Sequence, residues 1–133
     1  MTDLREMLGA VSLEPVFNID ELAAVLQALT DLDRDSTTCA TAMMAHNGDM
    51  LSATRAALDC ADIAGAAQRV LSRATASDTG VIRAILEAAA TAADRCATEC
   101  GQHASHHDHC RVHSETARRA AELCRAELKN VTA

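Results

Sequence analysis

Residues 17–46 read FNIDELAAVLQALTDLDRDSTTCATAMMAH, and this segment predicts a long helix with one buried face. Asn18 is suited to cap the first turn, and Phe17 is placed to pack onto Leu22. From Leu22 onward, apolar or small residues recur at alternating steps of three and four, the spacing of a helix that buries one side. Residues 47–48, Asn-Gly, are expected to end the helix. The inward positions expected from this spacing are Leu22, Val25, Leu29, Leu32, Ser36, Cys39, Met43 and His46.

The same spacing predicts three further helices. The second begins behind Asp49 and ends at residues 77–80, the third ends in a histidine-rich turn at 103–109, and the fourth follows that turn. Short connections between successive helices favour an antiparallel, up-down-up-down bundle. We therefore expect an all-α protein with an N-terminal arm or short helix over residues 1–17 and a four-helix bundle over residues 18–133.

The composition agrees with long, closely packed helices. The chain has 133 residues, of which 49% are hydrophobic, but it contains one aromatic residue, Phe17, and 29 alanines. Alanine is the best helix former and a poor strand residue, and one proline and five glycines leave few helix breakers. This composition excludes a β-sandwich or barrel and predicts a thin core.

Charge and hydropathy exclude several kinds of partner. A net charge of −7 leaves no large positive surface for phosphates, and the chain has almost no aromatic side chains on which bases could stack. No run of about 18 uncharged apolar residues occurs, so neither a membrane span nor a secretory signal is expected. We expect a cytoplasmic protein with no nucleic acid or membrane partner. Six cysteines in that compartment are expected to stay thiols, available as metal ligands or reactive groups.

The candidate ligands gather at one end of the predicted bundle, which carries His46 and residues 103–109 and is called here the histidine end. Cys96, Cys100 and His103 lie at i, i+4 and i+7, so they share one helix face and can share one ion. Thiolate, thioether and imidazole ligands select Cu(I) or Zn(II) over Mg(II) and Ca(II). The half of the core nearest the histidine end is expected to contain Cys39, Met43, His46, Met50, Cys60, Cys96, Cys100, His103, Cys110 and His113.

Other interpretations of these residues stay open. A buried cysteine also packs as a small hydrophobe, so Cys60 and Cys124 are either ligands or core residues, and Met43 can simply fill a gap. His106 and His107 are expected to face solvent. An enzyme is not expected, because no oxyanion-stabilising loop accompanies the cysteines and histidines, and the Glu-x-x-His pattern of di-iron bundles does not occur.

Several phrases of the sequence resemble the four-helix-bundle copper storage proteins. These phrases are Leu58-Asp-Cys-Ala-Asp-Ile63, Cys96-Ala-Thr-Glu-Cys-Gly-Gln-His103, His109-Cys-Arg111 and Ala120-Ala-Glu-Leu-Cys-Arg125. The resemblance implies the same bundle, a homo-oligomer (tetramer or dimer), and Cu(I) that enters at the histidine end. The ligands it implies are Cys39, Cys60, Cys96, Cys100, His103, His109, Cys110 and Cys124.

The chain departs from the family's pattern where further inward cysteines are expected. Ala64, His113, Ala117 and Ala120 occupy four such positions. The leading hypothesis is therefore a Cu(I)-binding protein that stores or buffers copper at reduced capacity. The alternative is a helical scaffold or interaction module that binds Zn(II), an iron cofactor or no metal.

Overall fold

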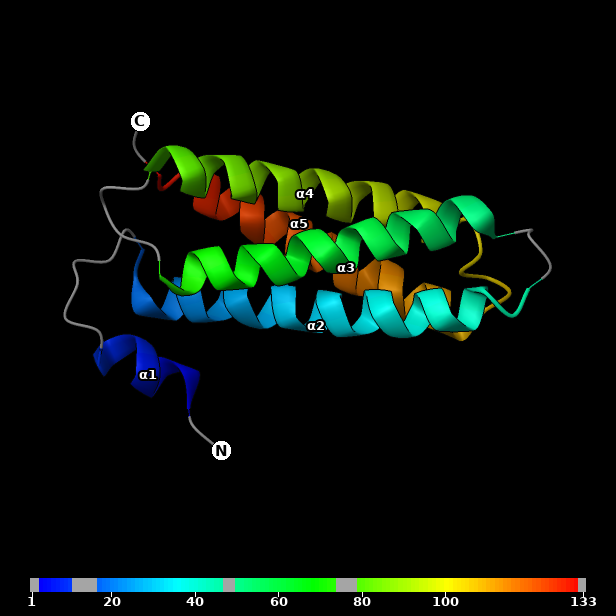
Figure 1. Cartoon of the computed structure of the whole chain (residues 1–133), viewed down its shortest axis with the longest axis horizontal. Coiled ribbons are helices and arrows are strands. Elements are labelled where there is room, and N and C mark those ends of the chain that lie inside the picture. Colours follow the sequence, from blue (N-terminus) through cyan, green and yellow to red (C-terminus); the bar gives the residue numbers. More distant parts are fainter. Residues whose placement is uncertain (1–2, 11–16, 47–49, 74–78, 132–133) are drawn as a thin grey trace.

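The computed structural model describes residues 3–10, 17–46, 50–73 and 79–131, and every regular element within these ranges is a helix. The all-α fold class is thereby confirmed. Figure 1 shows a short helix beside four long ones. The helices are α1 (Leu4–Ala10), α2 (Ile19–Met43), α3 (Leu51–Ser72), α4 (Thr79–Gly101) and α5 (Asp108–Leu128).

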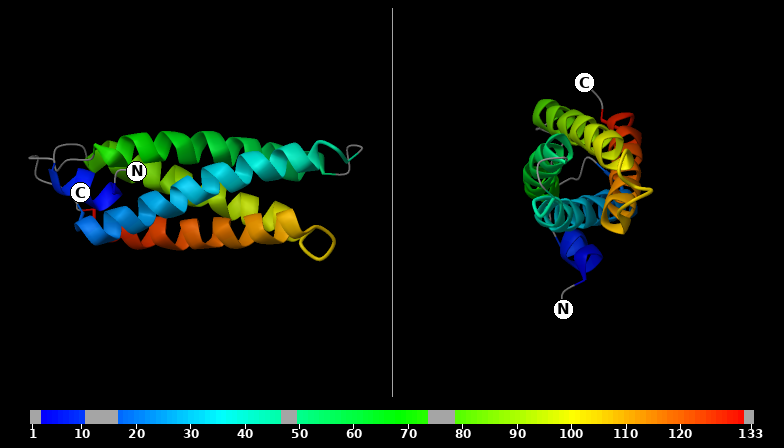
Figure 2. Two further views of the ribbon diagram at one scale, coloured as in Figure 1. Left: turned by 90° about the horizontal axis from the view of Figure 1, so that it is seen from below. Right: turned by 90° about the vertical axis from the view of Figure 1, so that its right-hand side faces the viewer.

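The four long helices form an antiparallel bundle with up-down-up-down connections. Helix α2 packs against α3 and α5, and α4 packs against the same two helices, so each long helix has two neighbours. The end-on view in Figure 2 shows the four around a common centre. The C-terminal end of α2 and the turn between α4 and α5 lie at the same end of the bundle, as expected of the histidine end.

The long α2 helix begins where the sequence predicted and ends slightly earlier. The Asn18 side chain accepts hydrogen bonds from the backbone N–H groups of Asp20 (2.8 Å) and Glu21 (3.3 Å), so it is the N-cap. The helix ends at Met43, and residues 44–46 form a turn rather than a further helical turn. The expected stop at residues 47–48 and the expected cap at Asp49 lie outside the described residues.

The boundary between α3 and α4 also differs from the expected one. Helix α3 ends at Ser72, and Thr79 and Gly80, expected in the connection, form the first turn of α4. Ser77 and Asp78 are outside the described residues, so the expected connection is wrong only for Thr79 and Gly80. Gly80 meets no heavy atom at its would-be Cβ, so this exposed start of the helix has room for a side chain and does not require glycine.

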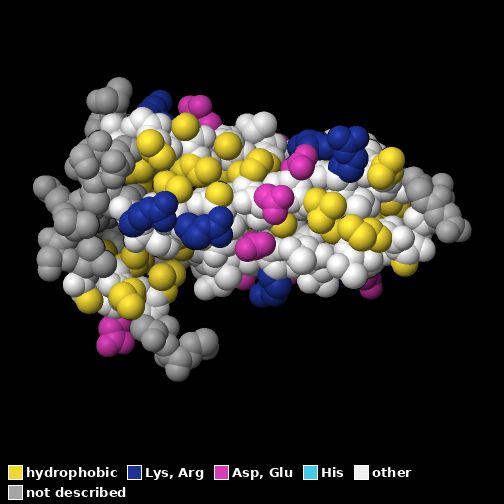
Figure 3. Space-filling view, in the orientation of Figure 1, with side chains coloured by type: hydrophobic (Ala, Val, Ile, Leu, Met, Phe, Trp, Pro, Cys, Tyr) yellow, Lys and Arg dark blue, Asp and Glu magenta, His cyan; other side chains and the backbone are white. Residues whose placement is uncertain are grey.

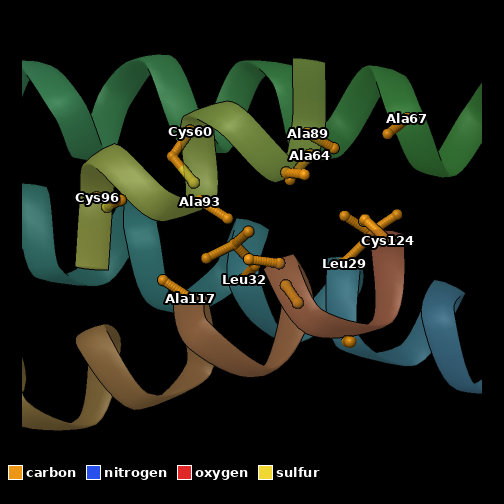
Figure 4. Packing of buried hydrophobic residues seen from close by; sticks show 14 of the residues in the cluster. Leu29, Leu32, Cys60, Ala64, Ala67, Ala89, Ala93, Cys96, Ala117 and Cys124 are labelled. Carbon is orange, nitrogen blue, oxygen red and sulfur yellow. The ribbon is translucent and has the colours of Figure 1, made fainter. Parts of the chain in front are cut away.

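Small side chains line the centre of the bundle. Figure 4 shows alanines from α3, α4 and α5 facing one another between a few leucines and cysteines. Because alanine projects only a methyl group, the helix axes can come close without leaving voids. The thin core predicted from composition is confirmed by the buried alanines Ala53, Ala57, Ala64, Ala67, Ala89, Ala93, Ala117, Ala120 and Ala121.

The short helix α1 lies outside the bundle, against α2. Arg5 forms an ion pair with Asp20 at the start of α2 (3.5 Å). The division of the chain into an arm over residues 1–17 and a bundle over 18–133 stays a prediction. Within the described residues, no helix combines the length and the apolar character that a membrane span requires.

Glu127, in the last turn of α5, is the exception to the apolar core at the end opposite the histidines. Its side chain is 4% exposed, and its Oε2 atom has no hydrogen-bond partner in the part of the chain that the structure describes. Burial raises the pKa of this carboxyl above its ordinary value; Asn130 opposes the shift and the charge of Glu21 adds to it. The ionised form is therefore disfavoured in the folded state.

Replacing Leu86 with alanine should lower the free energy of unfolding by about 2–5 kcal/mol, because Leu86 is fully buried and alanine leaves a cavity. Chemical denaturation measures the change. Leu58→Ala, at an exposed position on α3, is the control and should cost far less. Equal losses in the two variants would contradict the burial assigned to Leu86.

The variant Glu127→Gln should be more stable than the parent protein at neutral pH. A carboxyl with a raised folded-state pKa favours folding below its unfolded pKa, and this contribution is lost as the pH rises through the folded value. The difference between the two proteins should therefore shrink on acidification, as denaturant unfolding at several pH values would measure. Glu122→Gln, at an exposed position, should show no such trend, and a pH-independent difference for Glu127 would refute the expectation.

Candidate metal centre

The centre of the site is a buried histidine from α5 that contacts thiols from α4. His113 Nε2 lies 3.1 Å from the Cys96 sulfur, and Nδ1 lies 3.4 Å from the Cys100 sulfur. The two sulfurs are 4.0 Å apart, as expected for residues one helical turn from each other. All three side chains are completely buried. Sequence spacing placed Cys96 and Cys100 together, and the fold adds His113 to them.

Helix α2 contributes two further side chains to this group, those of Ser36 and Cys39. Ser36 Oγ lies 2.7 Å from His113 Nε2, close enough for a hydrogen bond that fixes the orientation of the ring. Cys39, one turn further along α2, has its sulfur within 4.8 Å of the ligand atoms of Cys100 and His113. The sequence placed Ser36 inward without assigning it a role. Its role becomes visible only when the imidazole it faces is known.

A second histidine joins the thiols nearer the histidine end. His109 Nδ1 lies 3.2 Å from the Cys39 sulfur and 3.5 Å from the Cys110 sulfur. Cys39 is therefore shared between two groups, one built around His113 and one built around His109. Both cysteines are buried and His109 is half-buried, so this second group lies between the core and the surface.

Three histidines lie together at the bundle end. The ligand nitrogens of His46, His107 and His109 are within 4.8 Å of one another, and the rings of His46 and His107 are 4.5 Å apart. His107 was expected to face solvent and is instead half-buried in this cluster, while His106 is exposed as expected. The flank of the molecule in Figure 3 presents apolar and charged side chains, and no described histidine is visible there.

The half-buried position of His109 favours the neutral form of its ring. Burial lowers the pKa of His109 below its ordinary value, and neighbouring His107 and His46 act in the same direction. A neutral imidazole has a lone pair for a metal ion, whereas a protonated one does not. His109 is thus suited to bind or to pass on a metal ion at physiological pH.

The thiols themselves differ in acidity because they donate hydrogen bonds to one another. Interactions with Cys39, Cys96 and His113 lower the pKa of Cys100 well below its ordinary value. Cys39 and Cys96 show the opposite shift, since hydrogen bonding to Cys100 and burial raise their pKa values. Burial likewise raises the pKa of Cys110. Hydrogen bonding within the group therefore favours the ionised form of Cys100 over that of Cys39 and Cys96.

Cys60 on α3 extends the group one step deeper into the bundle. Its interaction with Cys96, and a further one with Ser36, lower the pKa of the Cys60 thiol, although burial acts against this shift. Figure 4 shows Cys60 beside Cys96 and displaced from it along the bundle towards Ala93. Cys60, which could have been either a ligand or a core residue, therefore lies in contact with the other thiols.

Cys124 is separated from this group. In Figure 4, Ala64, Ala89 and Leu32 lie between it and the level of Cys60 and Cys96, and Leu29 is its neighbour. Cys124 is 14 residues beyond Cys110 on α5, which corresponds to about 21 Å along the helix. Burial raises its pKa to about 12. The position agrees with a core residue better than with a ligand.

Three other candidate ligands, Met43, Met50 and His103, lie outside the group of thiols and imidazoles. Met43 and Met50 are buried near the histidine end, as expected. His103 was expected on the inward face of the helix that carries Cys100, but α4 ends at Gly101 and His103 lies half-buried in the turn that follows. Within the described residues, His103 joins none of the groups of His, Cys, Asp and Glu that could hold a metal ion.

The fold and the site together define a class of protein: a four-helix bundle whose core carries thiols and imidazoles that are suited to soft metal ions. The sequence model of the copper storage protein family matches residues 18–129. The chain belongs to the copper storage protein family, and the resemblance noted in the sequence is confirmed. No curated protein matches the chain.

Solved structures of copper storage proteins from Streptomyces lividans are similar to the chain. Ccsp loaded with 10 copper equivalents has a TM-score of 0.91 and 30% identity, covering 96% of this chain and 99% of that one. A histidine-to-alanine variant of Ccsp has a TM-score of 0.83 and 32% identity, with coverage of 86% and 98%. A cytosolic copper storage protein carrying five coppers has a TM-score of 0.80 and 35% identity, with coverage of 83% and 93%.

Replacing Cys100 with serine should reduce the thiolate absorption that the metal-free, reduced protein shows in the ultraviolet at pH 7. The reason is that hydrogen bonds from its neighbours lower the pKa of this thiol and so favour its ionised form. Cys124→Ser is the matched control and should leave the absorption unchanged, because burial raises the pKa of Cys124 to about 12. Equal losses in the two variants would show that the interactions around Cys100 do not set its acidity.

Proposed function

We propose that this chain binds Cu(I) inside the bundle and stores or buffers it at reduced capacity. The observation that carries the proposal is the continuity of soft ligands from the surface to the middle of the core. The order from the histidine end inward is His46 and His107, His109, Cys110 and Cys39, His113 and Cys100, and then Cys96 and Cys60. Neighbouring members of this series are close enough to share or exchange an ion.

The chemistry of the ligands supports Cu(I) as the cargo. Thiolate ligands select Cu(I) and Zn(II) over harder cations, and the core around the sulfurs offers no carboxylate among the described residues that could favour Mg(II) or Ca(II). Membership of the copper storage family supports copper among the soft metals. Burial shields bound Cu(I) from water and oxygen.

The number of thiols limits the capacity. The relative from Streptomyces lividans was loaded with 10 copper equivalents, whereas this chain has six cysteines and one of them, Cys124, lies apart from the rest. Ala64, Ala117 and Ala120 line the core between the thiol group and Cys124 with methyl groups, which offer no ligand. Copper is therefore held in the half of the bundle nearest the histidine end.

The three clustered histidines form the access path. His46 and His107 are partly open to solvent, and His109 contacts both this cluster and the sulfurs of Cys39 and Cys110. An ion captured by the outer imidazoles reaches the first thiols by exchanging one ligand at a time. His103, which the sequence suggested for this role, lies outside the cluster.

Cellular location and assembly complete the proposal. The protein works in the cytoplasm, where thiols stay reduced; the relative with five coppers is described as cytosolic. Copper ions are its partners, and catalysis forms no part of its role. The homo-oligomer, a tetramer or a dimer, stays a prediction that sedimentation equilibrium would measure.

An anaerobic Cu(I) titration of the reduced protein against a chromogenic chelator tests the function. We expect tight uptake of several Cu(I) per chain, fewer than the 10 equivalents of the relative, and weaker binding as the pH falls because thiols release protons when they bind. The double variant Cys96→Ala/Cys100→Ala should lose most of the capacity, since it removes two central ligands.

Cys124→Ala provides the control, because it removes a buried cysteine outside the thiol group and should keep the capacity of the parent protein. Failure of the parent protein to compete with the chelator would refute copper storage and favour a helical scaffold without Cu(I). Equal loss of capacity in Cys124→Ala and in the double variant would contradict the placement of copper in one half of the bundle.

A further inference from the structure

The end of the bundle opposite the histidines contains a buried carboxyl group that the described residues satisfy only in part. Glu127, in the last turn of α5, is 4% exposed, and its Oε2 atom accepts no hydrogen bond within the part of the chain that the structure describes. Buried carboxylate oxygens in folded proteins nearly always have a partner, because an uncompensated buried charge is costly. This oxygen is therefore suited to hold a proton or a cation.

A second carboxylate and an amide lie beside Glu127. The start of α2 and the end of α5 lie at the same end of the bundle (Figures 1 and 2). The backbone N–H of Asn130 donates to the Glu127 carbonyl oxygen (2.9 Å), and Asn130 Nδ2 donates to Glu21 Oε2 (3.4 Å). The Glu127 carboxyl faces both residues: a hydrogen bond with Asn130 lowers its pKa and the charge of Glu21 raises it. Oxygen atoms from two helices thus meet at one point.

The position of Glu127 within α5 also favours a cation. The last carbonyl groups of a helix have no partner within the helix, and they give its C-terminal end a partial negative charge. A carboxylate in the last turn adds to this negative charge, and Glu21 adds a second carboxylate. A cation at this point interacts favourably with the helix end and with both carboxylates.

The basic side chains near this end do not neutralise the two carboxylates. Arg83 of α4 donates Nη1 to the Val131 carbonyl oxygen at 2.8 Å. Lys129, just beyond α5, is exposed. Within the described residues, neither Glu21 nor Glu127 forms an ion pair with a lysine or an arginine. The protein itself therefore supplies no counter-charge there among the groups that the structure describes.

We propose that Glu21, Glu127 and Asn130 form a site for one oxygen-preferring divalent cation, of which Ca²⁺ is the best match. Ca²⁺ accepts carboxylate and amide oxygens in a flexible geometry, and it loses water more readily than Mg²⁺, which suits the buried Oε2 atom. Rotation of the Asn130 amide presents Oδ1 in place of Nδ2. Water completes the coordination on the side of Glu21, which is exposed.

This site goes beyond copper storage and does not depend on it. Its ligands are oxygen atoms at the end of the bundle opposite the histidines, and Ca²⁺ and Cu(I) prefer different ligand types. The bound cation connects the start of α2 to the end of α5. We therefore expect it to raise the stability of the bundle and to leave the copper capacity unchanged.

Thermal unfolding of the chelator-treated protein, with Ca²⁺ or Mg²⁺ added at constant ionic strength, tests the site. The unfolding midpoint should rise with the concentration of Ca²⁺ and rise less with Mg²⁺, because a ligand that binds only the folded state stabilises it. Isothermal titration calorimetry should give one Ca²⁺ per chain. Binding should weaken as the pH falls, since a proton and the cation compete for the Glu127 carboxylate.

Glu127→Gln keeps the shape of the side chain and should lose the Ca²⁺-dependent rise. Without the cation this variant is expected to be more stable than the parent protein, so Ca²⁺ should narrow the difference between the two. Glu21→Gln should also reduce the response, because it removes the second carboxylate. Glu122→Gln, at an exposed acidic position on α5, is the matched control and should keep the full response.

Far-ultraviolet circular dichroism checks that each variant keeps its helices. If Glu127→Gln does not fold, Glu21→Gln decides, because Glu21 is exposed and its replacement leaves the core intact. A midpoint of the parent protein that does not respond to Ca²⁺ would overturn the proposal. So would an equal response in the parent protein, Glu127→Gln and Glu21→Gln.

The Cu(I) titration separates this proposal from the storage function. Glu127→Gln should keep the copper capacity of the parent protein, and Cys96→Ala/Cys100→Ala should keep its Ca²⁺ response. A protein that stores Cu(I) without responding to Ca²⁺ would overturn the cation site alone. A Ca²⁺ response in a protein that takes up no Cu(I) would overturn storage and support the cation site.

Discussion

Close approach of four helices through alanine is the constraint on which the rest of the structure depends. Methyl groups occupy many of the inward positions, so the helices can approach one another closely and the interior has little room for a bulky substrate. A cysteine side chain adds one sulfur atom to the methyl group of alanine and packs as a small hydrophobe, so cysteines fit this narrow core. The same short distance brings sulfurs from α2, α3, α4 and α5 into one group.

The side chains that line the core change from polar and metal-binding types to apolar types along the bundle, while the four-helix fold stays the same. Histidines occupy one end, thiols and His113 follow, and alanine with leucine fills the remainder as far as Glu127. Soft-metal chemistry is confined to the part in which soft ligands adjoin one another, and the apolar part contributes the stability of the bundle. Cys124 lies in the apolar part, which explains why its thiol is hard to ionise.

Spacing within one helix predicted part of the site, and contacts between helices decided the rest. Cys96 and Cys100 follow from an i, i+4 pair, but their histidine partner is His113 on α5 rather than His103 seven residues from Cys96. The reason is that α4 ends at Gly101, so His103 leaves the helix face that the spacing assumed. The prediction that His107 faces solvent is wrong for a similar reason. Its neighbour His46 lies in the turn after α2, and no spacing near His107 could indicate that contact.

The sequence by itself determined the all-α fold, the antiparallel order, the buried faces and the family, because helical periodicity, capping at Asn18 and alanine content are local properties that survive in any packing. It also determined which ligand types are present, and hence a preference for soft metals. The tertiary structure alone decided which ligands meet, that Cys60 joins the group and Cys124 does not, and that Ser36 orients His113. These outcomes depend on the rotation and relative height of separate helices, which no spacing within a single helix specifies.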